Sequence, residues 1–242
     1  MKVTEKREIL IDAFTKLSIP SSKKALFHPI VLTSSSGALT SSQLDVTKVT
    51  ERHFSWIPFK LEAEEGERLV LDPQMLLSAL DRMNDDLVLV TFEEGKISLT
   101  TSKKSVVFRA DVMIGDTATD RVLKNHVVKL ETDAGEVRDA VTGVGKAEYP
   151  KITLHVTPGI AEIIVGSLES SASETKTRIP AAMTWLKSSE DVRVSVSQLF
   201  PMILGCVEGK VDLLLAEKYP IAVVSVKDKV SVRYHIAPIV EG

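Results

Sequence analysis

The five histidines and the single cysteine are the side chains best suited to bind a transition metal, because imidazole and thiolate are preferred zinc ligands. They are scattered along the chain, at His28, His53, His126, His155, Cys206 and His235. No His-x-x-x-His or Cys-x-x-Cys spacing gathers two of them within one short motif. The spacing therefore predicts no metal site and no cofactor, and we expect the histidines at solvent-exposed or strand positions.

Motifs for phosphate binding and nucleophilic catalysis are incomplete. The run GVGK at 143–146 resembles the end of a phosphate-binding loop, but that loop needs Gly where Ala140 stands and Ser or Thr where Ala147 stands. No serine lies in a Gly-x-Ser-x-Gly elbow. We therefore expect no enzyme. An enzyme with dispersed carboxylates stays a distant alternative, because catalytic groups need to meet only in space.

Composition and charge limit the function classes further. The 242 residues are 44% hydrophobic and 26% charged, as in ordinary globular proteins. Proteins that grip nucleic acid tightly carry a basic excess, whereas this chain has a formal charge of −3, so any DNA contact must be local and loose. One cysteine excludes an internal disulfide, and the charged start MKVTEKREIL has no signal-peptide core. We expect an intracellular protein without a membrane span.

Four short segments have helical periodicity, with apolar residues recurring every three or four positions. The first is expected over 7–17. The second begins with Asp72 and Pro73, a combination typical of an N-cap and a first helical residue. Capping-box spacing opens the other two, at Asp133 with Glu136 and at Ser195 with Gln198.

A pair of strand-like segments follows each predicted helix. The pairs are 25–33 with the strand after the turn 34–37, 87–92 with 96–99, 151–156 with 160–165, and 211–215 with 220–226. Four repeats of one helix-then-strands unit predict an α+β chain of two similar domains. Small polar residues at 115–120 break the strand pattern, so we expect domains at 1–110 and 127–242 joined by a connector at 111–126.

Three motifs occur in an order that resembles one known family. SSSG at 34–37 followed by LDVTKV at 44–49 is similar to a serine-glycine turn and a Leu-Asp loop. VVKL at 127–130 with AGE at 134–136 resembles the start of a second domain. YHIAPIVE at 234–241 is similar to the family's aromatic, aliphatic, Ala-Pro, acidic ending. Together they resemble the DNA sliding clamps of the proliferating cell nuclear antigen (PCNA) family, either archaeal-type or a divergent paralogue.

The resemblance implies a ring, usually of three subunits, with helices around a central hole and antiparallel sheets outside. Such a ring is a processivity factor: it encircles duplex DNA and tethers DNA polymerase, nuclease, ligase and clamp loader through short peptides. We expect a homotrimer or a heterotrimer with sister subunits, in the cytoplasm or nucleoid if archaeal and in the nucleus if eukaryotic. The alternative is a clamp-fold scaffold or regulatory paralogue that binds protein partners without loading on DNA.

The resemblance also implies three sets of site residues. The DNA-facing cations would be Lys6, Arg7, Lys16, Arg82, Arg138 and Lys146. The partner-peptide pocket would hold Leu44, Val49, Met113, Ile114, Pro220, Ile236, Ala237 and Pro238. The subunit interface would use the strand edges at Ser105, Val107 and Arg109 and at Thr175, Thr177 and Ile179. Each residue could equally be ordinary solvated charge or strand-end core.

Two features depart from the family pattern. The fourth predicted helix has no cation between Ser195 and Glu208, and Pro201 fits that helix only if it starts late or kinks. In the connector, Thr117 and Thr119 stand where the family presents apolar side chains, so Met113 and Ile114 are the nearest apolar substitutes. A mixed ring whose sister subunits supply more positive charge would tolerate the first departure, and the second predicts a shallower pocket or different partners.

Overall fold

The structure is a computed structural model that describes residues 1–18, 30–44, 50–93, 95–109, 123–142, 150–167, 174–197 and 199–239. The described residues form helices α1 (Arg7–Leu17), α2 (Pro73–Leu80), α3 (Ala134–Thr142) and α4 (Leu199–Leu204). They also form strands β1 (Lys2–Lys6), β2 (Ile30–Ser35), β3 (Ala38–Leu44), β4 (Thr50–Trp56), β5 (Lys60–Glu62), β6 (Arg68–Leu71), β7 (Leu87–Glu93), β8 (Lys96–Thr100) and β9 (Ser105–Arg109). The remaining strands are β10 (Val128–Asp133), β11 (Pro150–Thr157), β12 (Ile160–Ser167), β13 (Thr175–Arg178), β14 (Ala182–Trp185), β15 (Val192–Val196), β16 (Lys210–Leu215), β17 (Ile221–Lys227) and β18 (Val230–Ile236). None of the described helices is long and apolar enough to cross a membrane.

The chain divides into two compact units. Unit one comprises Met1–Lys48, Arg52–Asp120 and Lys227–Val232. Unit two comprises Val49–Glu51, Arg121–Val226 and Arg233–Gly242. Strands β4, β17 and β18 therefore contribute residues to both units. The limits 1–110 and 127–242 remain a proposal about where the domains begin and end.

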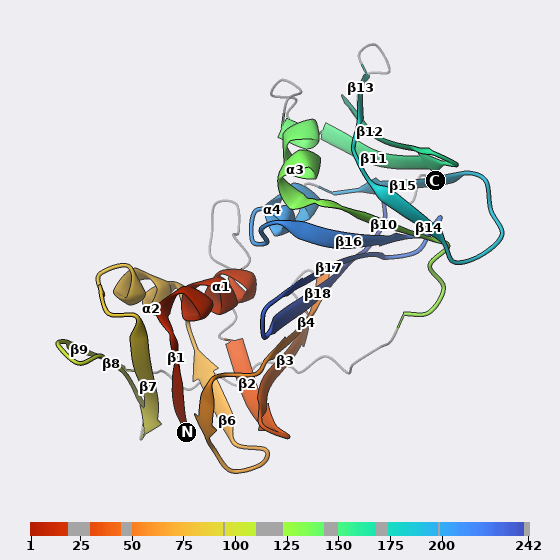
Figure 1. The fold of residues 1–242 in the computed structure, drawn as a ribbon. Coiled ribbons are helices and arrows are strands. Elements are labelled where there is room, and N and C mark those ends of the chain that lie inside the picture. Colours follow the sequence, from red (N-terminus) through yellow and green to blue (C-terminus); the bar gives the residue numbers. More distant parts are fainter. Residues whose placement is uncertain are drawn as a thin grey trace. The chain divides into compact units, whose positions relative to one another are not determined.

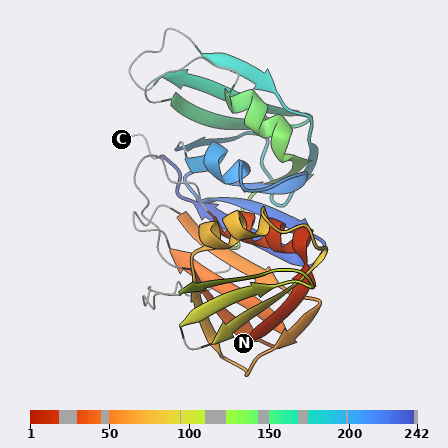
Figure 2. The ribbon, with the colours of Figure 1, turned by 90° about the vertical axis from the view of Figure 1, so that its left-hand side faces the viewer.

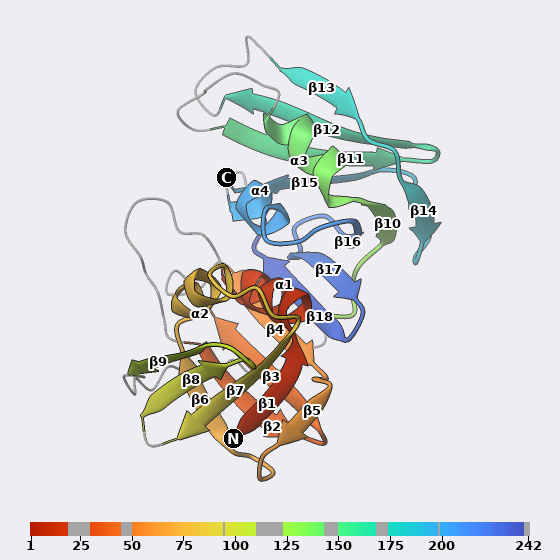
Figure 3. The same ribbon diagram turned by 60° about the vertical axis from the view of Figure 1, so that its left-hand side comes forward.

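In unit one, helices α1 and α2 lie side by side against β-sheet structure (Figures 1 and 3). One sheet has the antiparallel order β5-β1-β7-β8-β9, and strand β2 pairs with β3 and β6 in another. Burial alternates along β4, which places Phe54 and Trp56 in the core. The Trp56 ring meets Phe14 of α1 edge to face, with centroids 6.2 Å apart, so this aromatic pair ties the helix to the sheet.

Unit two repeats this arrangement with α3, α4 and antiparallel strands (Figure 2). One sheet has the order β13-β12-β11-β15, and β10 pairs with β14 on one side and β16 on the other. Helix α3 contacts β10 and β12, and its residues Val137, Ala140 and Val141 are buried. These are the apolar residues that helical spacing predicts, because they recur at three and four positions.

The predicted helix starts are confirmed at three of the four helices. Helix α1 spans Arg7–Leu17 as expected. The Asp72 carboxylate accepts a 2.9 Å hydrogen bond from the backbone N–H of Gln74, and Asp133 accepts one of 2.8 Å from Gly135.

The predicted start of the fourth helix is wrong. Ser195 lies on β15, where it pairs with Thr153 of β11, and α4 begins only at Leu199. Because the helix starts late, Pro201 falls in its first turn, where the missing proline N–H costs no helical hydrogen bond. Strand β15 thus includes Ser195, which capping-box spacing assigned to the helix start.

Removing the α2 cap should destabilise unit one modestly. We expect Asp72→Ala to lower the free energy of unfolding by about 1 kcal/mol, because the Gln74 N–H loses its acceptor at the helix start. Chemical denaturation measures the change. Asp81→Ala is the matched control, since Asp81 is exposed at the C-terminal end of α2, where a negative charge opposes the helix dipole. A loss as large in the control would contradict the capping role.

Candidate functional site

The cations expected to face DNA fall into different environments. Lys6, Arg82 and Arg138 are exposed. Arg7 is half-buried, and its Nε donates a 2.7 Å hydrogen bond to the carbonyl of Leu80 at the end of α2. Lys146 lies outside the described residues. Three of the expected cations are therefore presented to solvent, and Arg7 also links the ends of the two helices in unit one.

Lys16 is placed differently from the expectation. Its side chain is 0% exposed, and its ammonium group lies 2.7 Å from the carboxylate of Asp12, one helical turn earlier. Lys227 of β17 approaches the same carboxylate at 3.9 Å. A buried ammonium in an ion pair cannot attract a phosphate backbone as an exposed one can, so Lys16 leaves the set of proposed DNA-facing cations.

The four helices are not basic as a group. Within their bounds they carry three cations, Arg7, Lys16 and Arg138, against four carboxylates, Glu8, Asp12, Glu136 and Asp139. Helices α2 and α4 contain no charged residue. Phosphate contacts dominate the affinity of non-specific DNA binding, so residues beside the helices, such as Lys6 and Arg82, would have to add to the attraction that Arg138 of α3 can supply.

The expected peptide pocket is described only in part. Val49, Met113, Ile114 and the side chain of Leu44 lie outside the described residues. Ile236 is fully buried, whereas Ala237, Pro238 and Pro220 are half-buried.

Strand β15 holds the carboxyl-terminal segment in place. Pro238 forms a bridge with Val196, and the N–H of Ile239 donates a 2.8 Å hydrogen bond to the carbonyl of Ser195. The Ala237-Pro238 segment is thus fixed along β15, with both side chains partly open to solvent.

Pro220 contacts His126, the last residue of the expected connector. A ring nitrogen of His126, Nε2, lies 3.1 Å from the Pro220 carbonyl, and the ring meets Tyr219 edge to face at 5.2 Å. Burial lowers the pKa of His126 below its ordinary value, although the Pro220 carbonyl opposes that shift. A neutral His126 therefore fixes the turn that carries Pro220 at neutral pH.

Unit two also contains an open cavity of about 320 Å³. Its lining residues are Asn125, Val127, Ser189, Asp191, Val192, Ala216, Glu217 and Tyr219. None of the described residues expected in the peptide pocket lines it. The cavity and the Ala237-Pro238 segment are therefore separate surfaces.

The strands expected at the subunit interface lie at sheet edges. β9 ends the five-stranded sheet of unit one, and β13 ends the four-stranded sheet of unit two. Their described backbones present unpaired edges, and Val107 at the centre of β9 is 60% exposed. Ile179 lies just beyond β13, is buried, and donates its N–H to the carbonyl of Ala161 at 3.0 Å. The exposed part of this edge is Thr175–Arg178.

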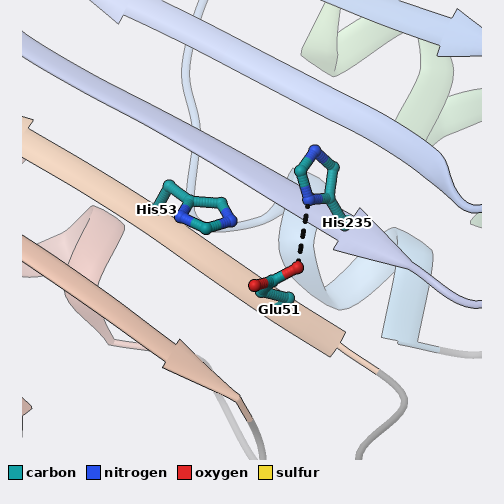
Figure 4. Close-up of side chains that lie close together, drawn as sticks. All are labelled: Glu51, His53 and His235. Atoms are coloured by element: carbon teal, nitrogen blue, oxygen red, sulfur yellow. Dashed lines mark hydrogen bonds and ion pairs between the residues drawn. The ribbon is translucent and has the colours of Figure 1, made fainter. Parts of the chain in front are cut away.

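One group of titratable side chains has no counterpart in the sequence-based expectations. Figure 4 shows Glu51 and His53 of β4 and His235 of β18, and in unit two Oε2 of Glu51 lies 3.4 Å from Nδ1 of His235. The two histidines are far apart in sequence, so no local spacing links them. The available signal was Glu51-x-His53, which places two side chains on one face of a strand.

Comparison with known proteins gives a result from solved structures alone. No protein-family model and no curated protein sequence matches the chain. It is similar to A. fulgidus PCNA bound to the C-terminal region of FEN-1, with a TM-score of 0.79, 13% identity and coverage of 100% of this chain and 99% of that chain. It is also similar to PCNA from Thermococcus kodakaraensis, with a TM-score of 0.79, 15% identity and coverage of 98% of this chain and 99% of that chain.

A third similar structure is a PCNA2-PCNA3 complex from Sulfolobus tokodaii, with a TM-score of 0.76, 13% identity and coverage of 98% of this chain and 99% of that chain. All three matches span essentially the full length of both chains. The order of helices and antiparallel strands in each unit agrees with the α+β class predicted from the sequence. The chain therefore has the fold of the PCNA-type DNA clamps.

Proposed function

We propose that the chain is a subunit of a DNA sliding clamp, a processivity factor that encircles duplex DNA and tethers replication and repair enzymes. The observation that supports this most is the full-length likeness to PCNA structures, at TM-scores of 0.76–0.79 despite 13–15% identity. A closed ring holds DNA topologically, so it needs little attraction for phosphate. That requirement suits a chain of net charge −3 whose helices carry more carboxylates than cations.

The edge strands β9 and β13 are the proposed contacts between neighbouring subunits, through main-chain pairing of exposed edges. Charges of both signs lie near these edges. Arg109 ends β9, and exposed Glu174 directly precedes β13, on which Lys176 and Arg178 are also exposed. Arg178 is offset by Glu162 at 3.4 Å. These charges suit pairing either between identical copies or with sister subunits.

Ala237, Pro238 and Pro220 are the described residues of the proposed partner-peptide pocket. A small side chain beside a proline leaves room for a partner's anchor residue, and proline limits the backbone entropy lost on binding. The partners proposed are DNA polymerase, nuclease, ligase and clamp loader. One of the similar PCNA structures carries such a segment, the C-terminal region of FEN-1.

Polymerase stimulation on primed circular DNA tests this function. With the cognate polymerase, a loader and any sister subunits, the chain should lengthen the products made in one binding event. The mass of the purified chain in solution decides what must be supplied. If the mass is near three times 26.5 kDa, the chain forms a homotrimer and no sister subunit is added to the assay. If the mass is that of a monomer or dimer, sister subunits must be added.

A second function, of a different class, is favoured by the charge on the helices. α4 is six residues long and uncharged, and Lys16 of α1 is buried. A clamp-fold scaffold that binds protein partners without loading on DNA would need no cationic lining. Peptide binding without stimulation of any cognate polymerase or ring partner would support the scaffold and contradict the sliding clamp.

Enlarging Ala237 should block the proposed pocket without unfolding the protein. We expect Ala237→Arg to weaken binding of clamp-interacting peptides by about 10-fold or more, which corresponds to about 1.4 kcal/mol. The half-buried position lets the longer side chain reach solvent, so the thermal transition should stay close to that of the parent. Fluorescence anisotropy with labelled peptides measures the affinity.

Leu186→Arg is the matched control, because Leu186 is also an apolar residue of unit two and is 50% exposed. It should leave peptide binding unchanged. If Ala237→Arg melts far earlier than the parent, or binds peptides equally well, Ala237 is a structural residue and the pocket assignment is wrong.

A further inference from the structure

The open cavity of unit two is a possible binding site that the proposed clamp function does not use. It lies between the segment before β10, the segment before β15 and the turn that joins β16 to β17, and it has a volume of about 320 Å³. Its two charged lining residues, Asp191 and Glu217, are both acidic. We propose that this cavity binds the side chain of an arginine that a partner protein presents.

The most buried part of the lining is apolar. Val192 and Ala216 are buried, and Val127 is half-buried. The stem of an arginine side chain packs on apolar surface of this kind while its charged end stays close to water. The volume lies at the lower end of the range for small-molecule sites, which is about 300–1,000 Å³. The cavity therefore suits one long side chain better than a large cofactor.

The rim of the cavity is acidic and polar. Asp191, Glu217 and Asn125 line it and are exposed. A guanidinium group presents several N–H donors in one plane, so it can bond more than one oxygen at once, whereas an ammonium group is a compact point charge. Tyr219 adds an aromatic wall, and guanidinium groups stack on aromatic rings. Lys187 approaches the Asn125 amide oxygen at 3.4 Å but does not line the cavity.

Contacts within unit two hold the walls of the cavity in place. Oδ1 of Asp191 lies 3.0 Å from Nε2 of His155, and the Ser189 hydroxyl donates a 3.1 Å hydrogen bond to the Asp191 carbonyl. The Tyr219 ring meets His126 edge to face at 5.2 Å. The Asp191 side chain is still 59% exposed, so its carboxylate remains accessible to a ligand. Walls that are fixed before binding reduce the entropy lost when the ligand enters.

The acidic rim favours an arginine within a protein over the free amino acid. Free arginine carries a carboxylate of its own, which would lie near Asp191 and Glu217, and like charges at short range repel. A residue inside a polypeptide has a neutral amide in place of that group. The proposed occupant is therefore an arginine in an exposed loop or terminus of a partner.

Nuclear magnetic resonance titration of the full chain with Nα-acetyl-argininamide tests the site. The backbone amide signals of Val127, Asp191 and Ala216 should shift and saturate, with a dissociation constant of about 1 mM for so small a probe. Nα-acetyl-citrullinamide is the matched ligand, because it keeps the shape and lacks the charge, and it should bind about 10-fold more weakly or less. Nα-acetyl-lysinamide should also bind more weakly, since its ammonium group cannot bond several rim oxygens in one plane.

Substitutions at the rim assign the binding to the cavity. Asp191→Asn and Glu217→Gln should each weaken binding of the arginine probe by about 5-fold, because each removes one negative charge. Glu190→Gln is the matched control, since Glu190 is an exposed carboxylate of the same segment that does not line the cavity. This variant should bind the probe like the parent.

The proposal is overturned if the cavity signals do not move, if the citrulline probe binds as well as the arginine probe, or if Glu190→Gln loses as much affinity as the rim variants. Equal or tighter binding of free arginine or of the lysine probe would contradict the assigned occupant. Loading on DNA and polymerase stimulation play no part in these measurements. A negative result therefore leaves the proposed clamp function standing.

Discussion

Asp12→Ala is expected to lower the free energy of unfolding by about 3–5 kcal/mol, because it removes one partner of a buried ion pair. The ammonium group of Lys16 is fully buried and lies 2.7 Å from the Asp12 carboxylate. Without that carboxylate, the desolvated charge of Lys16 loses a compensating negative charge 2.7 Å away. At about 2–4 °C for each kcal/mol, the thermal transition should fall by roughly 10 °C. Differential scanning calorimetry measures both quantities.

Lys16→Met separates this structural role from DNA attraction. Methionine matches the length of the lysine stem and removes the buried charge, so we expect a change of no more than about 1 kcal/mol. Retention on DNA should also be unchanged, since Lys16 is 0% exposed. A large loss of DNA retention in a stably folded Lys16→Met would show that Lys16 does contact DNA. A harmless Asp12→Ala would contradict the buried pair.

Trp56→Ala is the second large effect, again about 3–5 kcal/mol of unfolding free energy. Trp56 is 1% exposed and packs edge to face on Phe14, so truncation leaves a cavity between β4 and α1. The helix would lose its aromatic contact with the sheet. Urea denaturation followed by circular dichroism measures the loss, which should appear in the transition of unit one.

Trp56→Phe is the control for that substitution. Phenylalanine keeps a ring against Phe14 and removes the indole N–H, which has no hydrogen-bond partner among the described residues. Removing an unpaired buried donor is favourable, which offsets part of the stability lost with the smaller apolar surface. Trp56→Phe should therefore lower the free energy of unfolding by less than about 1.5 kcal/mol. Equal losses in the two variants would argue against aromatic packing as the cause.

Local signals were sufficient for most of the fold. The Asp72-Pro73 start of α2 depends on chemistry within one turn, and the sequence alone predicts it. The hairpin between β2 and β3 was predicted with a four-residue turn at 34–37. The structure narrows the turn to Ser36 and Gly37, both with positive φ, while Ser34 and Ser35 complete β2. Sheet pairing extends a strand until backbone geometry forces the turn.

Long-range contacts decided what the sequence could not reveal. Lys16 follows Ala13 by three residues, so it lies at the margin of the apolar face of α1, and only tertiary packing buries it. Glu51 and His235 lie on strands from opposite ends of the chain, and no spacing rule joins them. Ser195 has a helix-capping pattern, but pairing with Thr153 keeps it in β15. In each case a distant partner outweighs a local preference.

Topological retention on DNA tests the central claim most directly. The chain, with its loader and any sister subunits, is loaded on nicked circular DNA, separated from free protein, and assayed before and after the circle is cut once. A sliding ring should remain on the circle at moderate salt and be lost on cutting, because it runs off the free ends. Retention that is equal on circular and linear DNA, or absent from both, would contradict the encircling clamp.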